Sequence, residues 1–434
     1  MILIYCSETS PRIEYTFDVI FNHILKSEYK ITFNLDEYIT YTGAKFSYGK
    51  NKPAEGLFFG IHNIMFEDII IKQYLEPIEW NGIKGFFQVQ DLGFLPFDLF
   101  ASAFYMLSRY EEYIAINYDK YKRYKPEDSV LYTYNLLDKP IVNIYANEFK
   151  KIIHSFFPFY QFPTVHSKFE VTFDIDNAFC YKQKGFLRST VSVIEDLVRF
   201  RFKNISDRFA TLLNIMPDPY DTYKKQVEIN DRYKLKPLYF FLLGDFGGHD
   251  KNVSYNNRTY RNLIKRMDEK YEVALHPSYG TTRSDKQLLV EKLRLENILG
   301  KKVTKSRQFF NKITLPETYE KLVEIGITDD YSMGYNQVIG FRAGTSSSFP
   351  FFDLKNNKEL PIMLHPYCMT DKMFKLHLRI RSTEVVYHAR QVWDNVKYTG
   401  GDFRMIMHNE TLGTKKMWRN WQTIYEEIIR MVKE

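Results

Sequence analysis

The chain has 434 residues, more than one ordinary hydrophobic core accommodates, so its length predicts two domains. Apolar residues make up 44% and charged residues 26%, a globular balance that excludes disordered and fibrous classes. No apolar run reaches the roughly 18–20 residues that cross a bilayer, so no stable membrane insertion is expected. Three isolated cysteines and the absence of a signal-peptide pattern predict a reduced, cytoplasmic protein.

The net charge of +7 is unevenly distributed along the chain. Residues 1–160 contain sixteen Lys and Arg against twenty Asp and Glu, whereas residues 161–434 contain 44 against 33. A basic half suits an anionic partner such as nucleic acid or lipid headgroups, although a coding bias toward Lys explains it more simply. Because no zinc-finger, RRM, KH or helix-turn-helix pattern accompanies the charge, no nucleic-acid partner is expected.

Strand and helix signals alternate in the first part of the chain. The apolar pattern that begins at Pro11 predicts a helix to about residue 26. A second helix is expected over 99–116, with Asp98 as its N-cap. These elements predict a smaller α/β domain, residues 1–160, of unknown role. Its predicted strands are 2–5, 31–33 and 57–61.

The same alternation continues beyond Pro163 to the end of the chain. Sustained over about 270 residues, it predicts a parallel sheet closed into a barrel, residues 167–434, with its chemistry at the carboxyl ends of the strands. The predicted strands are 169–175, 237–243, 271–275, 304–309, 326–330, 360–364 and 404–407. The predicted helices are 186–214, 220–233, 260–270, 285–299 and 417–432.

Acidic residues and histidines follow several of these strands. FEVTFDIDNAF places Asp174 and Asp176 two residues apart at a strand end, so both carboxylates would face the same mouth. YEVALHPSYG and FRMIMHNE end their strands with His276 and His408. Each of these residues alone is also consistent with a solvated strand end or a satisfied core histidine. Together they predict a divalent metal held by one carboxylate and one imidazole, with the second acid free as a base.

Two further motifs end strands of the predicted barrel. Arg307, in KSRQFF, could pair with the acid that does not ligate the metal and keep it ionised. Asp329 and Asp330 end another strand in GITDDYSMGY. A carboxylate there could hold a histidine in its useful tautomer.

The motifs TFDID, LHPSY, SRQ, TDDYSMGY and MHNE occur in an order that resembles the polysaccharide deacetylases, the NodB-homology domain of carbohydrate esterase family 4. DPYDTY, GFRAGT and LPETYEKLVEIGITDDYSMGY resemble a branch with an extra N-terminal domain, and LGFLPFDLFASAFYMLSRYEEY resembles that domain. The resemblance implies a distorted (β/α)7 barrel. It also implies metal-dependent removal of N-acetyl or O-acetyl groups from a sugar in a glycan or glycan precursor.

The resemblance implies a role for each candidate residue. Asp174 matches the catalytic base. Asp176 and His276 match ligands of a divalent metal, zinc or alternatively nickel or cobalt. The remaining matches are Arg307 for the arginine that orients the base, His408 for the general acid and Asp330 for the acid that tunes that histidine.

Two positions depart from the family's metal motif. The second metal histidine of the motif is replaced by Gly280, and a histidine that follows Arg-Gln in the branch is replaced by Phe309. A third protein ligand would have to come from His249, His365 or Asp330. The departures leave an alternative function open: a catalytically degenerate protein that binds glycan or a partner in polysaccharide biosynthesis.

The helix predicted over 186–214 has an unbroken apolar stripe with basic residues mostly outside it. We expect the stripe to pack on the barrel. The alternative is a weak, salt-sensitive contact with an anionic membrane. The stripe consists of Leu187, Val191, Ile194, Val198, Phe202, Ile205, Phe209 and Leu212.

Overall fold

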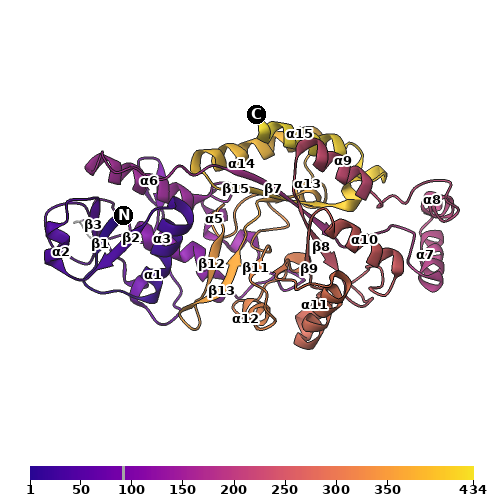
Figure 1. The fold of residues 1–434 in the computed structure, drawn as a ribbon, viewed down its shortest axis with the longest axis horizontal. Coiled ribbons are helices and arrows are strands. Elements are labelled where there is room, and N and C mark those ends of the chain that lie inside the picture. Colours follow the sequence, from indigo (N-terminus) through magenta and orange to yellow (C-terminus); the bar gives the residue numbers. More distant parts are fainter. Residues whose placement is uncertain (90–92) are drawn as a thin grey trace.

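The computed structural model describes residues 1–89 and 93–434, without the side chain of Leu187. The first part of the chain contains a four-stranded parallel sheet in the order β2-β1-β3-β4 (Figure 1). The strands predicted near residues 2, 31 and 57 are confirmed as members of this sheet. Its strands are β1 (Ile2–Tyr5), β2 (Tyr29–Thr32), β3 (Lys45–Gly49) and β4 (Phe58–Gly60).

Helices pack around this small sheet. The predicted first helix is α1 (Pro11–Phe17), which continues as a π-helix over Asp18–Leu25. The N-cap at Asp98 is confirmed, because its carboxylate accepts hydrogen bonds from two backbone N–H groups of α3 (Leu99–Leu107). The predicted continuation to residue 116 is wrong, since Arg109 has a φ of 53° and interrupts the helix before α4. The other elements are α2 (Leu35–Thr40), β5 (Ile78–Trp80), β6 (Ile83–Gly85), α4 (Tyr110–Tyr113), α5 (Val130–Thr133) and α6 (Ile141–Phe156).

The second part is built on a nine-stranded sheet in the order β12-β13-β11-β10-β9-β8-β7-β15-β14. All neighbours are parallel except β12 and β13, which pair antiparallel. No pairing within the described residues joins β12 to β14, so the predicted closure into a barrel is not found. The strands are β7 (Lys168–Ile175), β8 (Leu238–Leu242), β9 (Glu272–His276), β10 (Lys305–Ser306), β11 (Asp329–Asp330), β12 (Phe349–Asp353), β13 (Lys358–Leu364), β14 (Met369–Thr370) and β15 (Asp402–His408).

Helices lie on both sides of these strands, as the alternating pattern predicts. In Figure 1, α9, α14 and α15 run above the strands, α11 and α12 lie below them, and α10 lies beside β8. The architecture is therefore mixed α/β. The helices are α9 (Tyr223–Tyr233), α10 (Arg258–Asp268), α11 (Asp285–Leu299), α12 (Glu317–Glu324), α13 (Asp371–Leu376), α14 (Val385–Thr399) and α15 (Trp421–Lys433).

The prediction of one long helix packed on the barrel is wrong. The segment forms two helices, α7 (Phe186–Val198) and α8 (Phe202–Leu212), separated at Phe200 by a left-handed φ of 53°. No helix in the described ranges is long and apolar enough to cross a membrane. The stripe is exposed rather than packed, apart from half-buried Ile205 and Leu187, whose side chain is not described; its exposed members are Val191, Ile194, Val198, Phe202, Phe209 and Leu212.

The two parts share one continuous hydrophobic core. A buried ionic network also joins them, because the guanidinium of Arg342 donates to both oxygens of Glu112 at 2.8 and 2.6 Å. Arg109 donates to the same carboxylate at 2.8 Å. Burial disfavours the charge on Glu112, but the two guanidinium groups hold the pKa of its carboxyl at about 2. This network ties the connection after α3 to the loop before β12.

We expect Glu112→Gln to lower the free energy of unfolding by about 3–5 kcal/mol, because it leaves the buried guanidinium of Arg342 without its charge partner and removes one of the two acids that pair with Arg109. Urea denaturation measures the change. The matched control is Glu195→Gln, which breaks an exposed pair with Arg199 and should cost less than about 0.5 kcal/mol. Equal losses in the two variants would contradict the structural role of the network.

Candidate functional site

A cavity of about 290 Å³ lies where the carboxyl ends of the central strands meet. The strand register positions its polar walls. His408 lies directly opposite Asp174 in the pairing of β15 with β7, and His276 is the last residue of β9. Five of the six predicted site residues line the cavity: Asp174, Asp176, His276, Arg307 and His408.

Asp174 is held by a buried guanidinium. The Nη1 group of Arg307 donates to Asp174 Oδ1 at 2.7 Å and to the hydroxyl of Thr172 at 2.7 Å. The Nε group of Arg307 donates to a backbone carbonyl, and the guanidinium also lies over the ring of Phe240. Its Nη2 atom is buried and has no hydrogen-bond partner in the described part of the chain. The predicted pairing of Arg307 with Asp174 is present.

His276 connects the same arginine to the second acid. Its Nδ1 atom lies 2.5 Å from the backbone carbonyl of Arg307, and its Nε2 atom lies 3.2 Å from Asp176 Oδ1. Burial disfavours the imidazolium, but the negative charges of Asp174 and Asp176 raise the pKa of His276 above its ordinary value. The two carboxylates therefore favour the protonated form of this imidazole.

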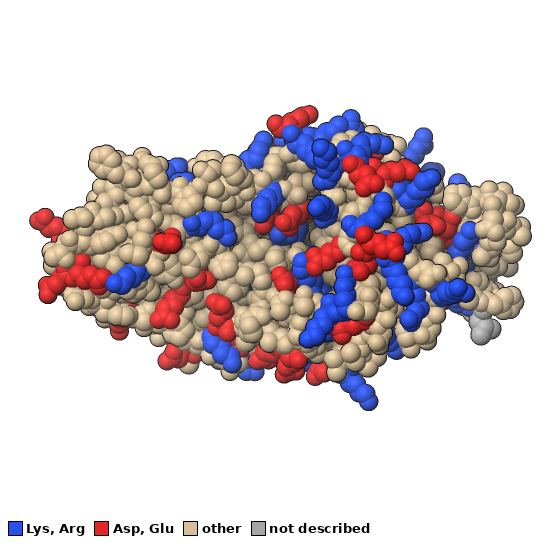
Figure 2. Space-filling view, in the orientation of Figure 1, with Lys and Arg blue, Asp and Glu red and all other residues tan. Residues whose placement is uncertain are grey.

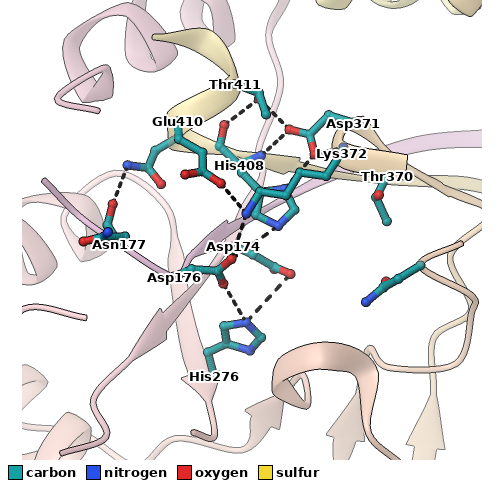
Figure 3. Close-up of polar contacts among 12 residues, drawn as sticks. Asp174, Asp176, Asn177, His276, Thr370, Asp371, Lys372, His408, Glu410 and Thr411 are labelled. Carbon is teal, nitrogen blue, oxygen red and sulfur yellow. Dashed lines mark hydrogen bonds and ion pairs between the residues drawn. The ribbon is translucent and has the colours of Figure 1, made fainter. Parts of the chain in front are cut away.

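The ammonium group of Lys372 completes the cluster around Asp176 (Figure 3). Its Nζ atom lies 2.9 Å from Asp176 Oδ2 and also pairs with Glu410. Burial disfavours both charges, yet Lys372 and the two histidines hold the pKa of Asp176 well below its usual range. The two carboxylates in turn raise the pKa of Lys372. A permanent cation thus lies beside the predicted metal-binding acid.

His408 is oriented by Asp371. The Nδ1 atom of His408 lies 2.6 Å from Asp371 Oδ1, and its backbone N–H donates to Asp371 Oδ2 at 2.6 Å. The Nε2 atom lies 3.7 Å from Asp176 Oδ2. Burial and Lys372 disfavour the imidazolium, but Asp371 outweighs them and raises the pKa of His408. Figure 3 shows His408 between Asp371 and Asp176.

The prediction that Asp330 tunes His408 is wrong. The Asp330 carboxylate instead accepts hydrogen bonds from the hydroxyl groups of Ser306 and Ser332, and burial raises its pKa to about 6. The tuning position belongs to Asp371, which begins α13 directly after β14. Asp371 and Lys372 were missed because β14 has only two residues and therefore shows no strand periodicity. The sequence does contain one signal for these residues: an acid and a base directly follow Thr370, a residue type that favours the N-cap of a helix.

The side chains around Asp176 do not fit a resident divalent metal. Asp176 already pairs with the imidazole of His276 and the ammonium of Lys372, whereas a catalytic zinc site commonly uses three protein ligands. Within the described residues, no group of three or more His, Cys, Asp or Glu side chains could hold an ion. The ring of Phe309 lies 5.3 Å from that of His276, so position 309 faces the site with an apolar group.

None of the three proposed substitute ligands lines the cavity. His365 bonds to Ser348 and Asp329, and His249 packs among aromatic rings that include Tyr279. Asp330 is occupied by serine hydroxyls, as described above. The residues around Asp176 therefore indicate a site in which protein side chains, and not a metal ion, compensate the charge of this carboxylate.

Comparisons with known proteins describe the two parts differently. Residues 2–158 match the model of a family of unknown function (DUF7033). A search of curated protein sequences finds no match. The chain is similar to solved structures titled as polysaccharide deacetylases, at sequence identities of 13% or less and TM-scores below 0.4. Likeness at this level does not establish a shared activity, so the function depends on the residues of the cavity.

Two of these structures carry titles that mark them as candidate deacetylases. The one from Mycobacterium smegmatis has 13% identity and a TM-score of 0.39, over 63% of this chain and 86% of that chain. The one from Bordetella bronchiseptica has 11% identity and a TM-score of 0.32, over 62% and 84%. A polysaccharide deacetylase from Bacillus cereus has 12% identity and a TM-score of 0.28, over 62% and 88%.

We expect Asp371→Asn to lower the pKa of His408, because the amide lacks the negative charge that stabilises the imidazolium. NMR titration of labelled histidine, with the signal assigned through His408→Gln, measures the pKa. Asp330→Asn is the control and should leave the pKa of His408 unchanged. A lowered pKa in the control but not in Asp371→Asn would restore the original assignment.

Proposed function

We propose that the chain is a deacetylase-like hydrolase that removes an acetyl group from a sugar in a glycan or glycan precursor. One observation carries the proposal: Asp174 and His408 lie opposite each other in the strand register, line one cavity, and are each held by a different buried partner. Two groups that can transfer protons are thus fixed on one reacting volume. The carbohydrate class follows from the motif resemblance and is compatible with the aromatic side chains of Phe309, Phe310 and Tyr367 in the cavity wall.

The proposed chemistry is direct hydrolysis of the acetyl bond. The carboxylate of Asp174 accepts a proton from water, whose oxygen attacks the acetyl carbon. The ammonium of Lys372 stabilises the negative charge that develops on the carbonyl oxygen. The bond from the acetyl carbon to the sugar nitrogen or oxygen then breaks, and the imidazolium of His408 protonates the leaving atom. The products are acetate and the deacetylated sugar.

Lys372 takes the place of a metal ion in this proposal. It supplies a positive charge beside Asp176, and its partner Glu410 keeps it positioned. The family resemblance implies a divalent metal, but its ligand Asp176 is paired with protein groups. We therefore propose a hydrolase in which the ammonium group of Lys372 provides the positive charge that a metal ion would otherwise provide.

We expect Asp174→Asn and His408→Ala each to lower acetate release from N-acetylglucosamine oligosaccharides by roughly 10²–10⁴-fold, because each removes a proton-transfer group. The control uses a second Asp–His pair of this chain outside the cavity. Asp329 and His365 lie 2.8 Å apart, so Asp329→Asn and His365→Ala should retain activity. Full activity in the Asp174 or His408 variant would remove that residue from the proposed reaction.

We expect chelator treatment to change neither acetate release nor the melting temperature, because Lys372 already neutralises Asp176. Metal analysis of the purified protein should find far less than one ion per chain. The double variant Lys372→Ser, Phe309→His should gain zinc affinity, since it removes the competing cation and adds an imidazole next to His276. Activity that is lost with chelator and restored by zinc would contradict the role assigned to Lys372.

The same charge balance favours a second candidate function, carbohydrate binding without hydrolysis. Asp176 pairs with both Lys372 and His276, so its charge is already compensated before any substrate enters. In that case calorimetry with the oligosaccharide shows binding while no acetate is released. Asp174→Asn then retains the affinity of the original chain.

A further inference from the structure

The helical hairpin formed by α7 and α8 exposes apolar side chains that helices of globular proteins ordinarily bury. Apolar side chains face solvent along both helices; Val191, Ile194 and Phe209 are each more than half exposed. Exposed apolar stripes of this kind usually mark a binding surface. A soluble helical pair would instead bury this stripe.

A small polar cluster lies in the interior of the hairpin. Asp196 of α7 accepts hydrogen bonds from Asn204 and Arg208 of α8, at 3.1 and 3.4 Å. Asp196 and Arg208 are buried, and the guanidinium also covers the ring of Tyr181 at 4.9 Å. The helices are therefore held together by charge and hydrogen bonding, which leaves their apolar sides free for another contact.

The turn between the helices alternates apolar and basic residues in the sequence VRFRFK, residues 198–203. Val198, Phe200 and Phe202 are 71%, 80% and 60% exposed. Arg199, Arg201 and Lys203 between them are also exposed. Residues 182–215 together contain seven Lys and Arg against three Asp and Glu. Figure 2 shows the right-hand end of the molecule, where the hairpin lies, as largely uncharged, with basic and acidic side chains at its inner margin.

The described part of the chain does not cover this surface. A cleft of about 1240 Å³ separates the hairpin from the loop after β8, with Lys184 and Val191 on one wall and Phe246 and Lys251 on the other. The helices therefore project from the sheet domain, as Figure 1 shows. An external surface has to cover the apolar side chains.

We propose that the α7–α8 hairpin docks on an anionic membrane surface. Its aromatic and aliphatic side chains enter the boundary between headgroups and acyl chains, and its basic side chains meet the lipid phosphates. The proposal is independent of the hydrolase function, because no residue of the hairpin lines the candidate catalytic cavity.

The composition of the surface favours lipid over two other partners. Nucleic acid would use the basic and aromatic residues but would leave the aliphatic side chains Val191, Ile194 and Val198 without a partner. A second copy would bring two basic turns of like charge together. An anionic bilayer satisfies both the apolar and the cationic side chains.

Co-sedimentation of the full chain with lipid vesicles tests the proposal. We expect binding to phosphatidylcholine vesicles that contain phosphatidylglycerol, weaker binding to phosphatidylcholine alone, and partial release at high salt. Phe200→Ser with Phe202→Ser should weaken binding at least about tenfold, because two apolar anchors are lost. Arg199→Gln with Arg201→Gln and Lys203→Gln should weaken it about 100-fold on anionic vesicles and little on neutral ones.

Matched control variants distinguish vesicle binding through the hairpin from non-specific adsorption of the protein. Phe159→Ser removes a side chain that is 96% exposed outside the hairpin and should leave vesicle binding unchanged. The triple variant Lys355→Gln, Lys358→Gln, Arg381→Gln removes three exposed charges elsewhere and should also bind normally. Circular dichroism of each variant verifies that the fold is retained.

Three results would overturn the proposal. One is an absence of vesicle binding by the original chain, or binding that the hairpin variants do not change. Another is a dimer in light scattering that the hairpin variants convert to monomer while vesicles remain unbound. The third is binding to a single-stranded RNA that the same variants abolish, again without vesicle binding. Acetate release from a soluble oligosaccharide should be equal in all hairpin variants, so failure here is distinguishable from failure of the hydrolase assignment.

Discussion

The candidate site depends on the parallel register of the central strands. The pairing of β15 with β7 places His408 opposite Asp174, and the pairings of β7 with β8 and β8 with β9 bring His276 to the same edge. Side chains alternate between the two faces of a strand, so a shift of one residue would turn His408 away from the cavity. The side chains of these strands are buried on both faces, so a slip would also disrupt their packing.

This concentration of ionisable groups imposes a second constraint, because buried charges are costly unless they are paired. Each group therefore has a partner from another element: Arg307 for Asp174, Asp371 for His408, and Lys372 for both Asp176 and Glu410. These pairs compensate one another's burial and restrict the motion of the side chains. The same physics explains why an apolar ring at position 309 is compatible with a stable site, since a lysine pairs with the acid.

Much of this site follows from local sequence patterns. Apolar runs that end in Asp174, His276 and His408 predict strand ends, and parallel strands place their carboxyl ends at one edge. Long-range pairing cannot be predicted in this way. Asp329 and Asp330 are adjacent acids with different partners, and only the tertiary structure shows that neither contacts His408. Apolar periodicity likewise identifies the stripe on α7 and α8 but does not determine what covers it.

The first part of the chain contributes directly to the cavity. Tyr121 and Arg123 belong to the region that matches the family of unknown function, and both line the cavity formed at the strand ends. Arg123 donates to the backbone carbonyl of Phe310 at 2.8 Å, and the rings of Tyr121 and Phe310 lie 5.0 Å apart. A volume of about 290 Å³ is at the small end for a ligand site. Under the proposed function, a sugar bound in this cavity would therefore meet side chains of the first part as well as those at the strand ends.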